Sequence, residues 1–192
     1  VRFWNCDPET LELELETLGE LMSERTRLVC VTHTSNVLGT INPIAEIARF
    51  VHERGARLCV DAVAYAPHRA MDVAAWDVDF YCFSLYKVYG PHHAALYVKR
   101  DVLLELDSIY HFFFDRSKIP NKMEPGNVNY ELTYACTAIS DYLEALGRRA
   151  EPSLDGRAAI ERAFSDIADH ESRIGEKLLA YLRDRHDVRI MG

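Results

Sequence analysis

The 192-residue sequence has no excess of positive charge, no long apolar run and no low-complexity tract. Its net charge of −8 argues against nucleic acid and anionic membrane surfaces as partners, because both attract basic patches. No apolar run approaches the roughly 20 residues of a membrane-spanning helix. What remains is ordinary globular composition, with 48% hydrophobic and 27% charged residues, in a chain long enough to bury a real core.

Paired metal-ligand or redox motifs are also missing. The five cysteines show no Cys-x-x-Cys spacing, and three of them lie in apolar strand-like runs, at Cys30, Cys59 and Cys82. Unpaired cysteine behaves as a small apolar residue, so we expect buried free thiols in a reducing cytoplasmic compartment. No third ligand follows His92 and His93 at a useful spacing, and we therefore predict no metal site.

Neither end of the sequence resembles a natural chain terminus. The chain opens on valine and closes on residues 188–192, which resemble the start of a strand. We expect a piece of a longer protein.

The apolar pattern of the first hundred residues alternates strands with a helix. Continuous apolar runs predict strands at 27–34, 57–63 and 79–84, and leucines predict a short helix ending near Glu24. Pro43 suits the first turn of a helix that Gly55 ends. This rhythm is typical of parallel βαβ packing. The strand at 94–98 follows too closely for a parallel crossover, so we expect it to run antiparallel to its predecessor.

Two helices are predicted after residue 130. Apolar positions mark one helix from Leu132 that Gly147 ends, and a second, longer helix runs from Ile160 to Leu182. We expect three parts: a main domain over 1–150, a connecting helix over 151–185, and the truncated start of a second, smaller domain over 186–192.

Candidate chemistry gathers where the predicted parallel strands end, because ligands bind beyond the carboxyl ends of such strands. Asn36 follows the first strand, Asp61 the second, and Ser84 and Lys87 the third. Each alone has an ordinary explanation: a helix or turn cap for Asp61 and Ser84, a solvated lysine for Lys87. Together they supply an amine that is nucleophilic in a partly dry, aromatic-lined site, an acid for a pyridinium nitrogen and a hydroxyl for a phosphate. These are the parts of a pyridoxal phosphate site.

The runs "VTHTSNVLGTINPIAEIARFVHERGARLCVDAVAYAPHRAMDV" and "DFYCFSLYKVYGP" carry a family likeness. Over about residues 1–147 the chain resembles class V aminotransferases, and within them cysteine desulfurases and selenocysteine lyases. The resemblance implies an α/β fold, the large-domain segment of a fold-type-I pyridoxal phosphate enzyme, with a mainly parallel sheet. It also implies that Lys87 forms the Schiff base, Asp61 pairs with the pyridine nitrogen, Ser84 binds phosphate and Asn36 lies near the ring.

The chain departs from the desulfurase pattern at four positions. Val63 stands where a small residue lies against the ring, and Ala64 replaces a glutamine that touches the cofactor's phenolic oxygen. Tyr86 replaces the histidine before the lysine. Asn127 replaces the threonine of a Gly-Thr-Pro turn that, in the family, reaches the neighbouring subunit's phosphate.

By this likeness we expect a pyridoxal-phosphate-dependent enzyme that acts on an amino acid and forms a homodimer. Two alternatives stay open: a truncated non-catalytic module that keeps the fold, and another class V aminotransferase or epimerase-type activity. No cysteine can be assigned a persulfide role, so we expect the chain as given to be inactive as a desulfurase. The aromatic run at 111–114 is expected to be a loop, which either packs internally or lines an entrance or dimer interface.

Overall fold

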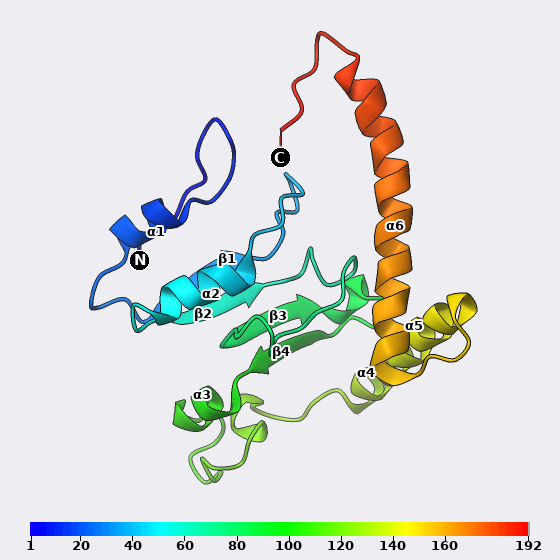
Figure 1. Cartoon of the computed structure of the whole chain (residues 1–192). Helices are drawn as coiled ribbons and strands as arrows, with labels where there is room; N and C mark the ends of the chain where they lie inside the picture. Colours follow the sequence, from blue (N-terminus) through cyan, green and yellow to red (C-terminus); the bar gives the residue numbers. More distant parts are fainter. Residues whose placement is uncertain (192) are drawn as a thin grey trace.

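The computed structural model describes residues 1–191 and contains one four-stranded sheet flanked by helices (Figure 1). The strands lie in the order β1-β2-β3-β4; β1, β2 and β3 are parallel and β4 is antiparallel to β3. The expected strand directions are therefore confirmed, including that of the last strand. The strands are β1 (Leu28–Thr32), β2 (Arg57–Asp61), β3 (Phe80–Ser84) and β4 (Ala94–Val98).

Helices occupy both ends of the chain and the β1–β2 crossover. Helix α2 follows Pro43 as expected, and Gly55 adopts a left-handed conformation (φ 72°) just beyond its end. The short helix α3 had no counterpart among the expected elements. The helices are α1 (Leu15–Leu21), α2 (Ile44–His52), α3 (Arg100–Glu105), α4 (Tyr130–Ala135), α5 (Thr137–Ala150) and α6 (Gly156–Arg183).

The core lies between α2 and one face of the sheet. Side chains alternate along a strand, so every second residue of the three parallel strands faces α2. These residues are buried, as is the apolar stripe of α2 that packs on them. The strand residues are Val29, Val31, Leu58, Val60 and Tyr81.

The other face of the sheet is open within the described residues, and it carries three of the five cysteines. Cys30 pairs in register with Cys59, and Cys82 pairs with Asp61. Cys30 is exposed, and the other two are half-buried. The prediction of buried thiols is therefore wrong for Cys30. Residues of this apolar run alternate between the two faces of the sheet, and Cys30 lies on the face that is not covered. Cys6 is also exposed.

Helices α5 and α6 pack side by side beyond the end of β3 (Figure 1). The expectation that Gly147 ends a helix is wrong, since α5 continues to Ala150. Gly147 instead allows the two helices to touch, because a β-carbon there would lie 1.9 Å from the carbonyl oxygen of Ala159. This glycine is therefore a packing residue rather than a helix stop.

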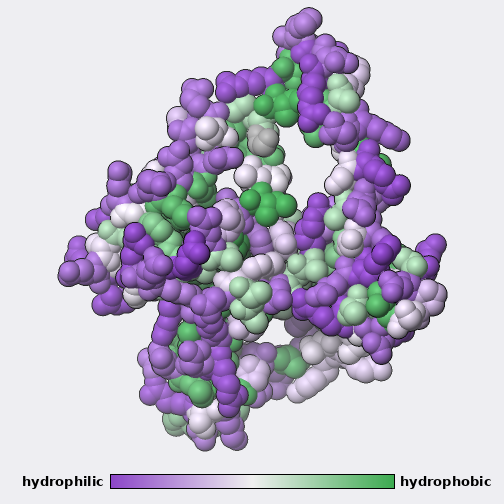
Figure 2. Space-filling view, in the orientation of Figure 1, coloured by the Kyte–Doolittle hydropathy of each residue, from purple (hydrophilic) through white to green (hydrophobic). Residues whose placement is uncertain are grey.

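The C-terminal half of α6 stands away from the sheet. Figure 2 shows a gap between this half, with the tail that follows it, and the body of the molecule. Ile174, Leu178 and Tyr181 are more than half exposed there. The predicted strand at the C-terminus is wrong over residues 188–191, which are irregular; Gly192 lies outside the described residues. The division into domains stays a prediction.

The aromatic run at 111–114 forms a turn, as expected. Phe112 is 100% exposed and Phe113 is 72% exposed, so internal packing is wrong for these two residues. Among the helices described, none has the length and apolarity needed to cross a membrane.

Candidate active site

A cleft of about 590 Å³ opens beyond the carboxyl ends of the parallel strands. Its walls come from the loop after β1, the turn after β2, the turn after β3, and one residue of α6. It brings together three of the predicted site residues, which are far apart in sequence: Asn36, Val63 and Lys87.

Lys87 closes a short 3-10 turn, Leu85–Lys87, that begins directly after β3. The next residue, Val88, is buried, and this anchors the far side of the turn. The lysine itself is exposed, and so are Tyr86 and Tyr89, whose rings turn to other partners: His92 and Tyr142. The expectation of a partly dry lysine is therefore wrong for the chain as it stands, and the aromatic residue that lines its cleft is Tyr65 rather than Tyr86 or Tyr89.

Asp61 and Ser84 occupy the last positions of β2 and β3. Asp61 Oδ1 accepts a hydrogen bond from the backbone N–H of Val63 at 3.0 Å. This contact ties the acid to the wall of the cleft and leaves the second carboxylate oxygen available. Ser84 makes no capping hydrogen bond to the turn that follows, so its hydroxyl is available as well.

Like Asp61 and Ser84 at the strand ends, two further predicted residues do not line the cleft. Tyr86 stacks on His92, with ring centroids 5.1 Å apart. Asn127 is exposed in the irregular segment before α4. Neither contacts the Lys87 cleft within this chain, and the assignment of both to a cofactor stays a prediction.

A buried aromatic cluster supports the cleft from behind, and no local sequence pattern predicted it. His33 is 3% exposed and stacks on Tyr65, a cleft residue, with centroids 3.6 Å apart. His33 Nδ1 lies 2.9 Å from the hydroxyl of Tyr81. Burial lowers the pKa of His33 to about 4, so the imidazole is neutral at physiological pH. Polar contact and stacking together fix the turn after β2 against the sheet.

A charged cluster closes the cleft on the α6 side. Glu171 Oε1 lies 2.6 Å from His68 Nδ1, and Glu171 Oε2 accepts a hydrogen bond from Arg69 at 2.8 Å. All three residues line the cleft. Glu171 is separated from its partners by more than a hundred residues, so no local pattern could have connected them.

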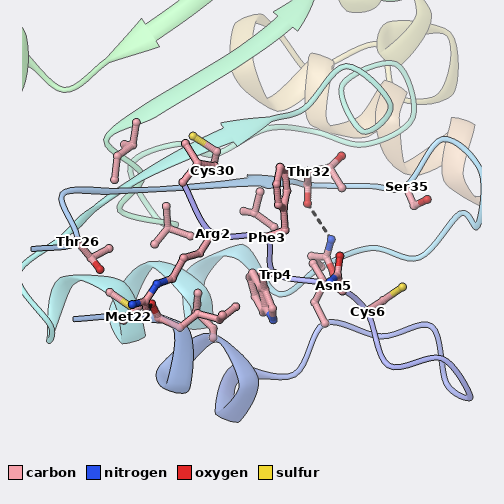
Figure 3. A pocket seen from close by; sticks show the side chains of 18 of the residues that line it. Arg2, Phe3, Trp4, Asn5, Cys6, Met22, Thr26, Cys30, Thr32 and Ser35 are labelled. Atoms are coloured by element: carbon pink, nitrogen blue, oxygen red, sulfur yellow. Dashed lines mark hydrogen bonds between the residues drawn. The ribbon is translucent and has the colours of Figure 1, made fainter.

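A second, larger cavity of about 1090 Å³ lies at the outer side of β1. In Figure 3, the N-terminal residues from Arg2 to Asn5 run beside Cys30 and Thr32. Cys6 and Cys30 line this cavity and not the Lys87 cleft, although Ser35 borders both. The two exposed thiols are therefore neighbours of the candidate site rather than part of it.

Comparison with known proteins decides the family. The family model of class V aminotransferases matches residues 1–192, the whole chain. The chain belongs to the class V aminotransferase family. This class V chain is 40% identical over 194 residues to the aminotransferase-like protein FGM3 of Gibberella zeae, covering 100% of this chain and 45% of that protein.

Two further relatives are named as a cysteine desulfurase or as a protein similar to one. The cysteine desulfurase-like protein ustD of Aspergillus flavus is 45% identical over 139 residues, covering 71% of this chain and 32% of that protein. A cysteine desulfurase of Escherichia coli O6:K15:H31 is 34% identical over 192 residues, covering 94% of this chain and 43% of that protein. The class V chain thus spans less than half the length of these relatives.

Solved structures agree with the fold. The cysteine desulfurase CsdA of Escherichia coli superposes with a TM-score of 0.61 at 26% identity, covering 79% of this chain and 44% of that one. The apo cysteine desulfurase of Thermococcus onnurineus superposes with a TM-score of 0.71, covering 93% of this chain and 43% of that one. The latter is 21% identical and supports the fold alone.

Proposed function

We propose that this class V chain carries the cofactor-binding part of a pyridoxal-phosphate-dependent enzyme that acts on an amino acid through Lys87. The observation that carries the proposal is the convergence of Lys87, Asn36 and Val63 on one cleft at the strand ends, with Asp61 hydrogen-bonded to Val63. Family membership supports the reaction class.

The residues present fit the cofactor by their chemistry. An amine, a carboxylate at a strand end and a free hydroxyl are the groups that an aldehyde, a pyridine nitrogen and a phosphate need. Thr34 Oγ1, at the cleft wall, is buried without a hydrogen-bond partner among the described residues, which adds an unused polar atom there.

Pyridoxal phosphate, when bound, supplies an aldehyde for the lysine amine and a ring that withdraws electrons from the substrate's α-carbon. Lys87 Nζ must lose its proton to act as a nucleophile, and it then carries protons to and from the reacting carbon. Asp61 would hold a positive charge on the pyridine nitrogen through its free oxygen. Ser84 would donate its hydroxyl to the phosphate, and Asn36 would lie near the ring.

We further propose a homodimer in the cytoplasm, with Asn127 reaching the partner's phosphate and Tyr86 and Val63 completing the surroundings of the cofactor. Phe112 and Phe113 supply an exposed apolar surface for pairing. A partner subunit would also cover part of Lys87, which is exposed in the single chain.

The rival proposal is a non-catalytic module, and the exposure of Lys87 is the observation that favours it. Incubation with pyridoxal phosphate followed by borohydride separates the two. We expect a new visible absorption band before reduction, and covalent label on the peptide that contains Lys87 afterwards. Label spread evenly over the chain's five lysines, or no band, supports the module.

A further inference from the structure

We propose that Glu171 of α6 is a positioning residue for the Lys87 cleft: it holds the turn after β2, and through that turn the lysine. This inference rests on the proposed function and deepens it, because it assigns to the long helix α6 a part in the geometry of the same site.

The first step is the contact between Glu171 and the turn after β2. Its two carboxylate oxygens bind different residues, His68 and Arg69, so the contact fixes orientation as well as distance. Arg69 also donates a hydrogen bond to the carbonyl oxygen of His68 at 2.7 Å, so the two partners of Glu171 are linked to each other. Burial raises the pKa of Glu171, but the hydrogen bonds from its two partners outweigh it and lower the pKa overall. The carboxylate is therefore charged at physiological pH.

The second step leads from the turn to the lysine segment. The hydroxyl of Tyr89 donates a hydrogen bond to the carbonyl oxygen of Pro67 at 3.2 Å, next to His68 in the chain. Tyr89 has a φ of 61°, a left-handed conformation that is unfavourable for a bulky residue. The segment two residues after Lys87 is therefore held in a strained state by its contacts, and Pro67 supplies one of them.

The third step is a shared core beneath these polar contacts. Ala66 of the turn, Val88 of the lysine segment and Phe164 of α6 are buried in one cluster. Three segments far apart in sequence thus meet at a single junction, with apolar packing below and the Glu171 contacts above. Loss of the Glu171 contacts should allow the turn to move, while the apolar packing beneath it preserves the fold.

A purely structural ion pair is the alternative explanation. Ion pairs as exposed as these, with side chains between a third and a half exposed, contribute little to stability. Removal of the carboxylate should therefore barely change the melting temperature. If the reactivity of Lys87 changes while the melting temperature does not, Glu171 acts as a positioning residue rather than as a structural support.

The experiment compares Glu171→Gln with Glu161→Gln. Glu161 lies on the same helix and pairs with Arg157 at 2.6 Å, outside the cleft, so it is a matched control for lost charge. Each protein is treated with limiting pyridoxal phosphate and borohydride, and the label on the Lys87 peptide is divided by the label on the peptide of Lys177. Lys177 is exposed on α6 and reports ordinary lysine reactivity.

We expect Glu171→Gln to lower this labelling ratio about 5-fold, the change that 1 kcal/mol of lost positioning produces. Glu161→Gln should leave it unchanged, and both variants should melt within about 2 °C of the parent, as small surface effects do. Arg69→Gln should also lower the ratio, and the double variant with Glu171→Gln should show no further loss, since both remove one contact.

The two proposals fail in different ways. A parent protein that labels Lys87 no better than Lys177 overturns the proposed function and this inference with it. A parent that prefers Lys87, together with a Glu171→Gln variant of unchanged labelling ratio, overturns this inference alone. An equal loss in Glu161→Gln also overturns it, because the effect would then be one of overall helix charge.

Discussion

Gly147 of α5 lies so close to Ala159 of α6 that a β-carbon on the glycine would sit 1.9 Å from the alanine's carbonyl oxygen. The obstacle is backbone, which has no flexible end to move aside. The two helices therefore depend on glycine for their separation, and α6 depends on it for its place beside the Lys87 segment.

Gly147→Ala should destabilise the protein, because the helices must separate to admit the new methyl group. Overpacking of this kind costs about 1–3 kcal/mol, which outweighs the higher helix propensity of alanine. Urea denaturation followed by circular dichroism measures the change. Gly175→Ala is the matched control, since nothing lies within 4 Å of its added β-carbon and the helix should gain stability there.

His33 should make stability depend on pH. Its pKa in the folded protein is lowered to about 4 from an ordinary value of 6.5, so between these values the unfolded chain binds more protons than the folded one. The neutral imidazole's contribution is complete above about pH 6.5 and is lost as the pH falls towards 4, by up to about 3 kcal/mol.

The test of this pH dependence is the free energy of unfolding, measured from pH 7 to pH 4 in the parent and in His33→Gln. The difference between the two curves should shrink as the pH falls. Parallel curves would show that His33 does not titrate in this window.

Asp61→Asn should weaken the binding of pyridoxal phosphate, because the amide keeps an oxygen for the N–H of Val63 but offers no charge to a pyridine nitrogen. Absorbance titration measures the affinity. Asp72→Asn is the control. Asp72 lies away from the cleft, and its Oδ1 accepts a similar turn hydrogen bond from the backbone N–H of Ala75 at 2.9 Å. Equal affinities for the parent and Asp61→Asn would assign Asp61 to capping alone.

The chain should form a homodimer that depends on its exposed aromatic turn. Replacing Phe112 and Phe113 with serine should shift the sedimentation equilibrium towards single chains, since the pair offers a large exposed apolar surface. Phe3→Ser, which removes an equally exposed aromatic side chain from the N-terminal segment, should have no such effect. A mass of one chain at every concentration would contradict the prediction for this chain.

The chain as given should not release sulfide from cysteine. A thiolate must attack the substrate sulfur, and burial together with neighbouring thiols raises the pKa of Cys59 to about 12. Cys6 and Cys30 are exposed but line the other cavity. The measurement is sulfide formed from cysteine, pyridoxal phosphate and a reductant. Turnover above that of free cofactor would contradict the prediction, and its loss in Cys6→Ser or Cys30→Ser would identify the thiol.

The sequence by itself determined the local elements and the family. Apolar runs marked the three parallel strands, and the short link between Lys87 and the next strand set its antiparallel direction. The acid, hydroxyl and lysine were found at the strand ends because chain connectivity alone puts them there. Their roles at a cofactor remain predictions, and the experiments above test those of Lys87 and Asp61.

Only the tertiary structure decided which residues meet across the chain. Glu171 reaches the cleft because α6 packs on the lysine segment, and Gly147 continues a helix because a neighbouring backbone lies against it. Cys30 is exposed because its side of the sheet is uncovered in this chain, while Val29 and Val31 beside it face the core. Hydrophobic periodicity is a property of single segments; contacts between segments depend on packing, which no local pattern contains.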